Sequence, residues 1–96
     1  MFKTLEELIT TIRQREGSAT EESYTKKLLN NKNLNIEKLK EEIVELIDAI
    51  EKNTNKVHEA ADVLYHLMVL LEANGVKIED VMSELKKRQK KQNDLR

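Results

Sequence analysis

Apolar residues recur along this chain with the spacing of amphipathic helices. The pattern predicts a short helix over residues 24–30 and four main helices, over residues 5–16, 36–52, 56–73 and from 78 onward. Thr4 and Glu7 form a capping box for the first of these, and Gly17 is its expected end. Asn35 is the expected N-cap of the helix over 36–52.

A polar turn at residues 53–55 separates the two central helices, which predicts an antiparallel hairpin. The predicted class is therefore all-α, with four main helices around this hairpin. Because a hairpin alone cannot cover the helix over 56–73 on every side, we expect a homodimer that completes a four-helix-bundle core. Residues 1–88 are expected to form one domain, followed by a basic C-terminal tail at 89–96.

The composition excludes several classes of protein. The 96 residues include no cysteine, which rules out disulfides and thiolate metal sites. No apolar run approaches the ~20 residues of a membrane span, and the N-terminus lacks a signal-peptide pattern. We therefore expect a soluble, cytoplasmic protein without a membrane partner.

The C-terminal end is strongly basic, since residues 86–96 hold six basic residues and one acidic residue. Such a tail can bind nucleic acid or a phosphorylated ligand, and it is more often a solvated helix end. Because it contains no aromatic residue to stack on bases, nucleic acid is not an expected partner.

Acidic residues interrupt the most apolar helix. Eleven of the fifteen residues from 57 to 71 are apolar, yet Glu59, Asp62 and His66 fall within about 60° of one another on the helical wheel. An unpaired carboxylate in such a helix costs several kcal/mol (order of magnitude), so a basic partner, protonation or a metal ion must compensate. No lysine or arginine lies between Lys56 and Lys77.

The helix over 36–52 presents a second acidic cluster opposite its apolar face, formed by Glu41, Glu42, Glu45 and Asp48. A divalent cation held by both helices would relieve the repulsion in each cluster, and Mg²⁺ favours carboxylate oxygens. The alternatives are acids that line a polar helix contact or face solvent. His66 is interpreted as a hydrogen-bonded core residue rather than a ligand, and His58 as a surface residue.

These acids follow a recognisable spacing. The pattern E-E-x-x-E at 41–45 with E-x-x-D at 59–62 resembles the signature of the all-α, MazG-like nucleoside triphosphate pyrophosphatases. The sequences SYT at 23–25 and EAADVLYHL at 59–67 are similar to motifs of one branch, the phosphoribosyl-ATP pyrophosphatase family of histidine biosynthesis. The resemblance covers roughly residues 5–88.

The resemblance implies an enzyme that hydrolyses the α–β phosphoanhydride of phosphoribosyl-ATP, giving phosphoribosyl-AMP and pyrophosphate, in the second step of histidine biosynthesis. The implied cofactor is Mg²⁺, with Mn²⁺ as an alternative. The implied metal ligands are Glu42, Glu45, Glu59 and Asp62. The implied catalytic residues are Glu41, Glu42 and Glu45, where Glu41 binds a second ion or orients the attacking water.

Lys27, Lys38 and Lys40 are candidates for contacts with the phosphates, although surface lysines are usually only solvated. Tyr24 and Thr25 are candidates for the pocket wall. For Tyr24, an aromatic anchor that packs the short helix on the core is an equal alternative. The chain departs from the family pattern beside the acids, because lysine replaces glycine at position 40 and Glu37 replaces a lysine.

Two other functions stay open. The departure at position 40 leaves room for a house-cleaning pyrophosphatase that acts on non-standard nucleoside triphosphates. The alternative of another class is a non-catalytic helical dimer that acts as a binding module through its basic tail. Retention of all five motif acids argues against this second alternative.

Overall fold

The computed structural model describes residues 1–17 and 23–91 of the chain. Within these ranges the chain forms helices and no strand, which confirms the all-α class. The helices of the described residues are α1 (Lys3–Gly17), α2 (Tyr24–Leu29), α3 (Lys32–Lys52), α4 (Lys56–Ala73) and α5 (Ile78–Lys91). Residues 18–22 and the last five residues of the predicted basic tail lie outside the described residues.

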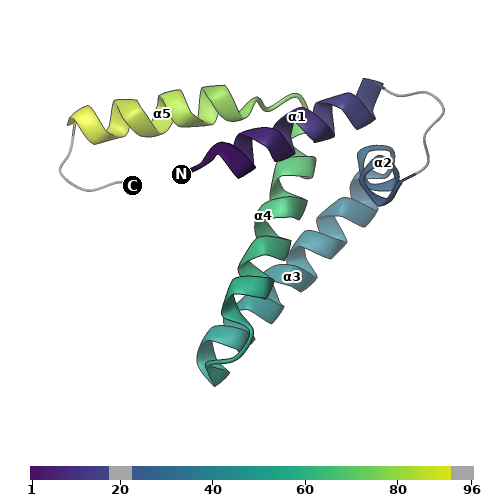
Figure 1. Ribbon diagram of the computed structural model, residues 1–96, viewed down its shortest axis with the longest axis vertical. Coiled ribbons are helices and arrows are strands. Elements are labelled where there is room, and N and C mark those ends of the chain that lie inside the picture. The colour runs from purple at the N-terminus through teal and green to yellow at the C-terminus, as the bar shows by residue number, and fades with distance from the viewer. Residues whose placement is uncertain (18–22, 92–96) are drawn as a thin grey trace.

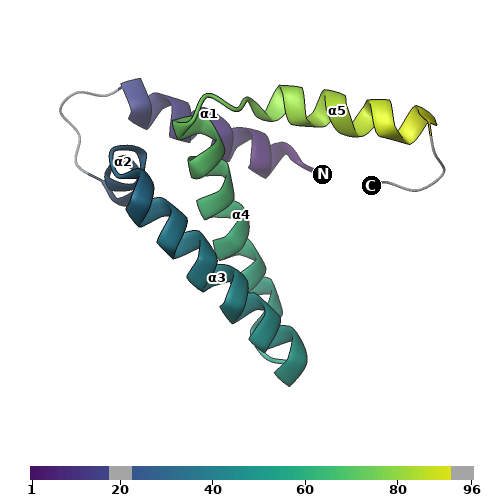
Figure 2. The same cartoon turned by 180° about the vertical axis from the view of Figure 1, so that it is seen from behind.

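Helices α3 and α4 form the predicted antiparallel hairpin, which extends as one arm of the molecule (Figure 1). Helices α1 and α5 lie across the end of α4 that is far from the hairpin turn, and α2 lies beside the first turns of α3. The view from behind shows the same arrangement (Figure 2). The two helices that carry the acidic motifs are therefore neighbours along most of their length.

The hairpin turn depends on asparagine. Asn53 (φ 57°) and Asn55 (φ 46°) both adopt left-handed backbone conformations, which asparagine tolerates better than most residues. Gly75 (φ 71°) follows the end of α4 in the same conformation, where glycine carries no steric cost. These residues fix the ends of α4, and the predicted boundaries of this helix, 56 and 73, are confirmed.

Two predicted helix starts are wrong. Helix α3 begins at Lys32, because the Asn31 side chain accepts a hydrogen bond from the Leu34 N–H at 3.1 Å and caps the helix one turn earlier than predicted. Asn35, the predicted cap, lies inside the helix and is fully buried. Helix α1 begins at Lys3, so Thr4 lies in its first turn and the Thr4 capping box does not mark the start.

The core lies where α1, α2 and α4 meet. Its buried side chains are Ile9, Ile12, Leu28, Met68 and Val69. Beside this core, the Arg13 guanidinium donates hydrogen bonds to both Glu72 (Nε–Oε1 2.8 Å) and Glu79 (Nη2–Oε1 2.7 Å). Arg13 thereby joins α1 to α4 and to the start of α5, and it fixes how these helices cross.

Apolar side chains are also exposed on the hairpin. On α3 and α4 they are Ile43, Val44, Ile47, Ile50, Val57 and Leu64. We call this set the exposed hairpin face. None of the helices in the described ranges combines the length and the hydrophobicity that crossing a membrane requires.

Candidate metal centre

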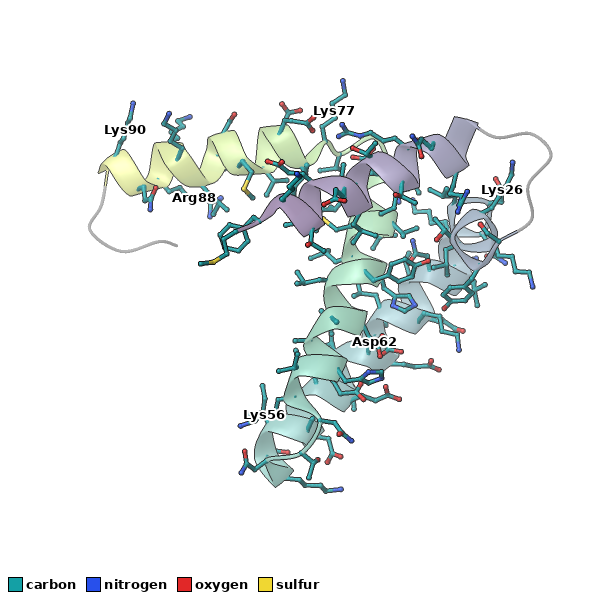
Figure 3. The ribbon with its side chains drawn as sticks, viewed as in Figure 1. Lys26, Lys56, Asp62, Lys77, Arg88 and Lys90 are labelled. Carbon is teal, nitrogen blue, oxygen red and sulfur yellow. The ribbon has the colours of Figure 1, made fainter. Side chains whose placement is uncertain are left out.

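The hairpin brings acids from both of its helices together. Oxygens of Glu42 and Glu45 on α3 and of Glu59 on α4 all lie within 4.8 Å of one another. We call these three residues the carboxylate cluster. A second group, the His58 cluster, consists of His58, Glu59 and Asp62, whose ligand atoms meet the same limit. Asp62 lies near the middle of the hairpin (Figure 3), and Glu59 belongs to both clusters.

The environment of these carboxylates is unfavourable for negative charge. Oε2 of Glu42 and Oε2 of Glu59 are buried, and neither has a hydrogen-bond partner within the described residues. Burial raises the pKa of Glu42, and the nearby charges of Glu45 and Asp62 raise it further. Burial also raises the pKa of Glu59, again reinforced by the charge of Glu45. Both acids therefore gain from any positive charge placed between the two helices.

The nearby lysines do not supply that charge. Lys38 pairs with Glu41 (3.4 Å) and Lys52 pairs with Asp48 (3.2 Å). Across the described part of the chain, no lysine or arginine forms an ion pair with a residue of the carboxylate cluster. The basic helix α5, with Arg88 and Lys90, lies on the other arm of the molecule from Asp62 (Figure 3). Of the three ways to compensate the acids, a lysine or arginine from the described part of the same chain is therefore excluded for these residues.

Glu41 does not join Glu42 and Glu45, the acids of α3 that face α4. It lies outside both clusters, is exposed, and pairs with Lys38. The reason is helical geometry, since adjacent residues project about 100° apart, so Glu41 and Glu42 cannot face α4 together.

His66 has the role that the sequence favoured, a buried and hydrogen-bonded core residue. Its Nδ1 lies 2.8 Å from the backbone oxygen of Asp62, and its Nε2 lies 2.9 Å from the Tyr24 hydroxyl. Because a carbonyl oxygen only accepts, Nδ1 of the neutral ring carries the proton and Tyr24 donates to Nε2. With both nitrogens engaged, His66 is not available as a metal ligand in this arrangement.

The predicted substrate residues on α2 make contacts with α4. The Tyr24 ring stacks on Tyr65 with centroids 6.2 Å apart, and the Thr25 hydroxyl hydrogen-bonds the Tyr65 hydroxyl. These contacts hold α2 beside α4, which agrees with the interpretation of Tyr24 as an aromatic anchor of the short helix. Lys27 and Lys40 are exposed.

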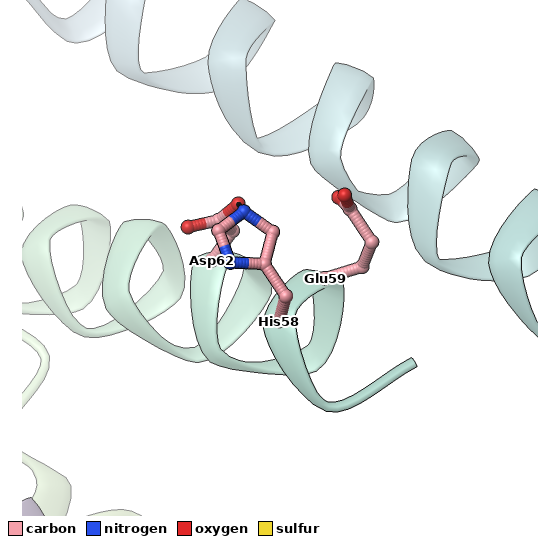
Figure 4. Close-up of side chains that lie close together, drawn as sticks. All are labelled: His58, Glu59 and Asp62. Carbon is pink, nitrogen blue, oxygen red and sulfur yellow. Dashed lines mark ion pairs between the residues drawn. The ribbon is translucent and has the colours of Figure 1, made fainter. Parts of the chain in front are cut away.

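The sequence interpretation assigned no functional role to His58. As expected, it is exposed, but its Nε2 lies 3.4 Å from Oδ2 of Asp62 across one helical turn (Figure 4). The spacing of four residues between His58 and Asp62 was the signal that could have identified this pair.

A separate apolar cleft of about 780 Å³ lies between α1 and α5. Its lining residues include Phe2, Leu5, Ile9, Ile78 and Met82. None of the residues that line this cleft belongs to either acidic cluster, so the cleft and the candidate metal centre are different features.

Fold and site together define an all-α domain whose central hairpin gathers carboxylates from both of its helices. Comparison with known proteins is more specific. The family model described as "Phosphoribosyl-ATP pyrophosphohydrolase" matches residues 5–89. The chain therefore belongs to the phosphoribosyl-ATP pyrophosphohydrolase family.

Individual relatives agree with this family. A phosphoribosyl-ATP pyrophosphatase of Methylobacterium nodulans is 46% identical over 88 residues, which cover 88% of this chain and 82% of the relative. A phosphoribosyl-ATP pyrophosphatase of Rhodobacter capsulatus is 45% identical over 87 residues, covering 88% and 84%. The histidine biosynthesis bifunctional protein HisIE of Pyrococcus furiosus is 41% identical over 91 residues, covering 94% of this chain and 42% of that longer protein.

Proposed function

We propose that this protein hydrolyses the α–β phosphoanhydride of phosphoribosyl-ATP to phosphoribosyl-AMP and pyrophosphate in histidine biosynthesis, with Mg²⁺ as cofactor. The observation that carries the proposal is the meeting of Glu42, Glu45 and Glu59 across the hairpin, with buried oxygens that lack a partner within the described residues. Two relatives that are 46% and 45% identical to this chain are named phosphoribosyl-ATP pyrophosphatase, and these names support the choice of substrate. The proposed location is the cytoplasm.

The donor set fits a hard divalent cation. Glu42, Glu45, Glu59 and Asp62 offer only carboxylate oxygens, which Mg²⁺ prefers and Mn²⁺ also accepts. These four residues would hold the ion. When bound, such an ion neutralises phosphate charge and lowers the pKa of a bound water.

The residues around the carboxylate cluster have distinct proposed roles. Glu41, which is exposed and precedes Glu42 on α3, orients the attacking water. Lys38 lies one turn before Glu42 on α3 and neutralises phosphate oxygens, and the exposed Lys27 and Lys40 contact the same group. Hydrolysis of a phosphoanhydride depends mainly on such positioning and charge neutralisation.

Helix α2 forms the proposed pocket wall. Tyr24 and Thr25 are held against α4 by Tyr65 and His66, so their positions are set before a substrate arrives. A preset wall beside the acids reduces the entropy lost when the nucleotide binds.

The proposed assembly is a homodimer. The side chains of Val44 and Ile47 are 66% and 52% exposed on α3, and Val57 is 86% exposed on α4. Several exposed apolar side chains on one helical hairpin are typical of a protein–protein interface. A second copy would place two more helices against this face and complete a four-helix core next to the acids.

Pyrophosphate release from phosphoribosyl-ATP tests the proposed function, with dATP and dUTP as competing substrates and with Mg²⁺ or EDTA. We expect release only with Mg²⁺, and loss of release in Glu59→Gln and in Asp62→Asn. Glu51→Gln is the matched control, because Glu51 is an exposed acid on α3 outside both clusters.

Each alternative function has its own result in this assay. Preferred hydrolysis of dATP or dUTP would indicate a house-cleaning pyrophosphatase. Absence of release from every nucleotide, in protein with an intact helical circular-dichroism spectrum, would indicate the binding module.

A further inference from the structure

His58 has the geometry of a metal ligand. It stands in the first turn of α4, and its Nε2 lies 3.4 Å from Oδ2 of Asp62, on the next turn of the same helix. Its side chain is 73% exposed, so packing does not hold the ring in place. Figure 4 shows the imidazole directed at the Asp62 carboxylate, with Glu59 beside it and directed toward α3.

The three side chains can reach one ion. One ligand atom from each of His58, Glu59 and Asp62 lies within 4.8 Å of the other two. Two ligands of one first-row metal ion, each at ~2.1 Å, lie at most about 4.2 Å apart, so binding would draw the three groups together through rotations of their side chains. Oε2 of Glu59 is buried without a hydrogen-bond partner in the described residues, which gives an observation independent of the histidine.

The nitrogen donor changes which ions this group prefers. An imidazole nitrogen is a good ligand for nickel, copper and zinc ions, whereas Mg²⁺ favours oxygen ligands. The chain has only two histidines, and both nitrogens of His66 are engaged by Tyr24 and by the Asp62 backbone. A nitrogen ligand near Asp62 must therefore come from His58.

We propose that His58, Glu59 and Asp62 form a mixed nitrogen–oxygen site that binds a divalent transition-metal ion at the edge of the carboxylate cluster. The proposal shares Glu59 and Asp62 with the proposed function, and it adds a ligand outside the all-carboxylate set. The site makes this protein bind Ni²⁺ and Cu²⁺ more tightly than the carboxylates alone would.

Two measurements on untagged, metal-free protein test the site. The first is pulsed EPR of bound Cu²⁺, in which the remote nitrogen of a coordinated imidazole gives a characteristic modulation. The second is calorimetric titration with Ni²⁺ and, separately, with Mg²⁺. Both are applied to wild type, His58→Gln, Glu59→Gln and Asp62→Asn. Lys56→Gln is the matched control, because Lys56 is an exposed residue in the same turn.

We expect the imidazole modulation in wild type and in Lys56→Gln, and its loss in His58→Gln. We also expect Ni²⁺ affinity to fall on the order of tenfold or more in His58→Gln, with a comparable fall in Glu59→Gln and Asp62→Asn. Mg²⁺ affinity should change by less than about twofold in His58→Gln, because Mg²⁺ favours oxygen ligands.

Three results would overturn the site. These are a modulation that survives in His58→Gln, a failure of wild type to bind Ni²⁺, and a Ni²⁺ affinity that Glu59→Gln and Asp62→Asn leave unchanged. A Ni²⁺ affinity that is unchanged in Glu59→Gln and Asp62→Asn would show that Ni²⁺ binds to an exposed imidazole alone. None of these results depends on substrate, so they are distinguishable from failure of the proposed function, which is absence of Mg²⁺-dependent pyrophosphate release by wild type.

Discussion

The hydroxyl of Tyr24 lies 2.9 Å from Nε2 of His66 and joins the short helix α2 to the middle of α4. Nδ1, the other ring nitrogen of His66, is hydrogen-bonded to the backbone oxygen of Asp62, a residue of the candidate metal centre. A single imidazole thus connects the proposed pocket wall to a proposed metal ligand. Any change at Tyr24 is therefore expected to affect both stability and the site.

Replacing Tyr24 with phenylalanine separates these two effects. The ring contacts with Tyr65 stay, but the buried Nε2 of His66 loses its donor, so we expect a loss of about 1–2 kcal/mol in the free energy of unfolding. Urea denaturation measures this loss. Unchanged stability would contradict the hydrogen bond between Tyr24 and His66.

The same variant tests whether Tyr24 also lines the pocket. If Tyr24 is only an anchor, KM for phosphoribosyl-ATP stays at the wild-type value under conditions where the variant is fully folded. A higher KM with unchanged kcat is the result that we expect for a pocket wall.

Asn35 gives a prediction of the opposite sign. Both polar atoms of its fully buried side chain lack hydrogen-bond partners among the described residues. Asn35→Leu should therefore raise the free energy of unfolding by about 1–3 kcal/mol. Asn33→Leu is the control, because Asn33 is exposed on the same helix and reports the gain in helix propensity alone. Equal midpoints of urea denaturation for the two variants would mean that the Asn35 side chain has partners in solution.

The Arg13 contacts predict a pH dependence of stability. Hydrogen bonding from Arg13 lowers the pKa of Glu79 from 4.5 to about 2. Because the folded pKa lies below the unfolded pKa, the contribution of Glu79 to stability is present above about pH 4.5 and is lost as the pH falls toward 2. We expect the urea midpoint to fall more steeply in this range for wild type than for Glu79→Gln. Parallel pH profiles of the two proteins would show that Glu79 does not bind Arg13 in solution.

The proposed dimer predicts that a charge on the exposed hairpin face changes the oligomeric state. Ile47→Lys should convert a dimer to a monomer in size-exclusion chromatography with light scattering, because a lysine cannot be buried there without a partner. Lys52→Gln, an exposed change near the end of α3, is the control. A wild-type protein that is monomeric at micromolar concentration would contradict the proposed dimer.

The sequence was most informative where apolar periodicity and turn residues agree. The helix over 56–73 combines a long apolar pattern with asparagine before it and Asn74-Gly75 after it, and its predicted ends are correct. The start of α3 was missed because four asparagines, at 30, 31, 33 and 35, are all acceptable caps by residue type. Only the folded backbone shows which side chain reaches a free N–H group.

For the candidate site, the sequence predicted which surface the acids share but not their individual side-chain contacts. The wheel and the hairpin together bring acids of both helices to one surface, and the structure places Glu42, Glu45 and Glu59 there. The spacings of Lys38 with Glu41 (i, i+3) and of His58 with Asp62 (i, i+4) allow both pairs, but only the side-chain rotamers show that the pairs form. The bridge from Arg13 to Glu72 joins residues 59 positions apart in sequence, and helical periodicity carries no information about such contacts.

The central claim is that the acids of the hairpin are placed for a cation. Because burial raises the folded pKa of Glu59 above its unfolded value, its charge opposes folding at pH values above the folded pKa. Removal of that charge should therefore stabilise the metal-free protein at pH 7. Mg²⁺ should stabilise the wild type and have much less effect on a variant that lacks a ligand.

The most direct test is the midpoint of thermal unfolding of wild type and Glu59→Gln at pH 7, in EDTA and in saturating Mg²⁺. We predict that Glu59→Gln has the higher midpoint in EDTA and that Mg²⁺ raises the wild-type midpoint more than that of the variant. Equal responses of the two proteins to Mg²⁺, or a wild-type midpoint that Mg²⁺ leaves unchanged, would contradict the claim.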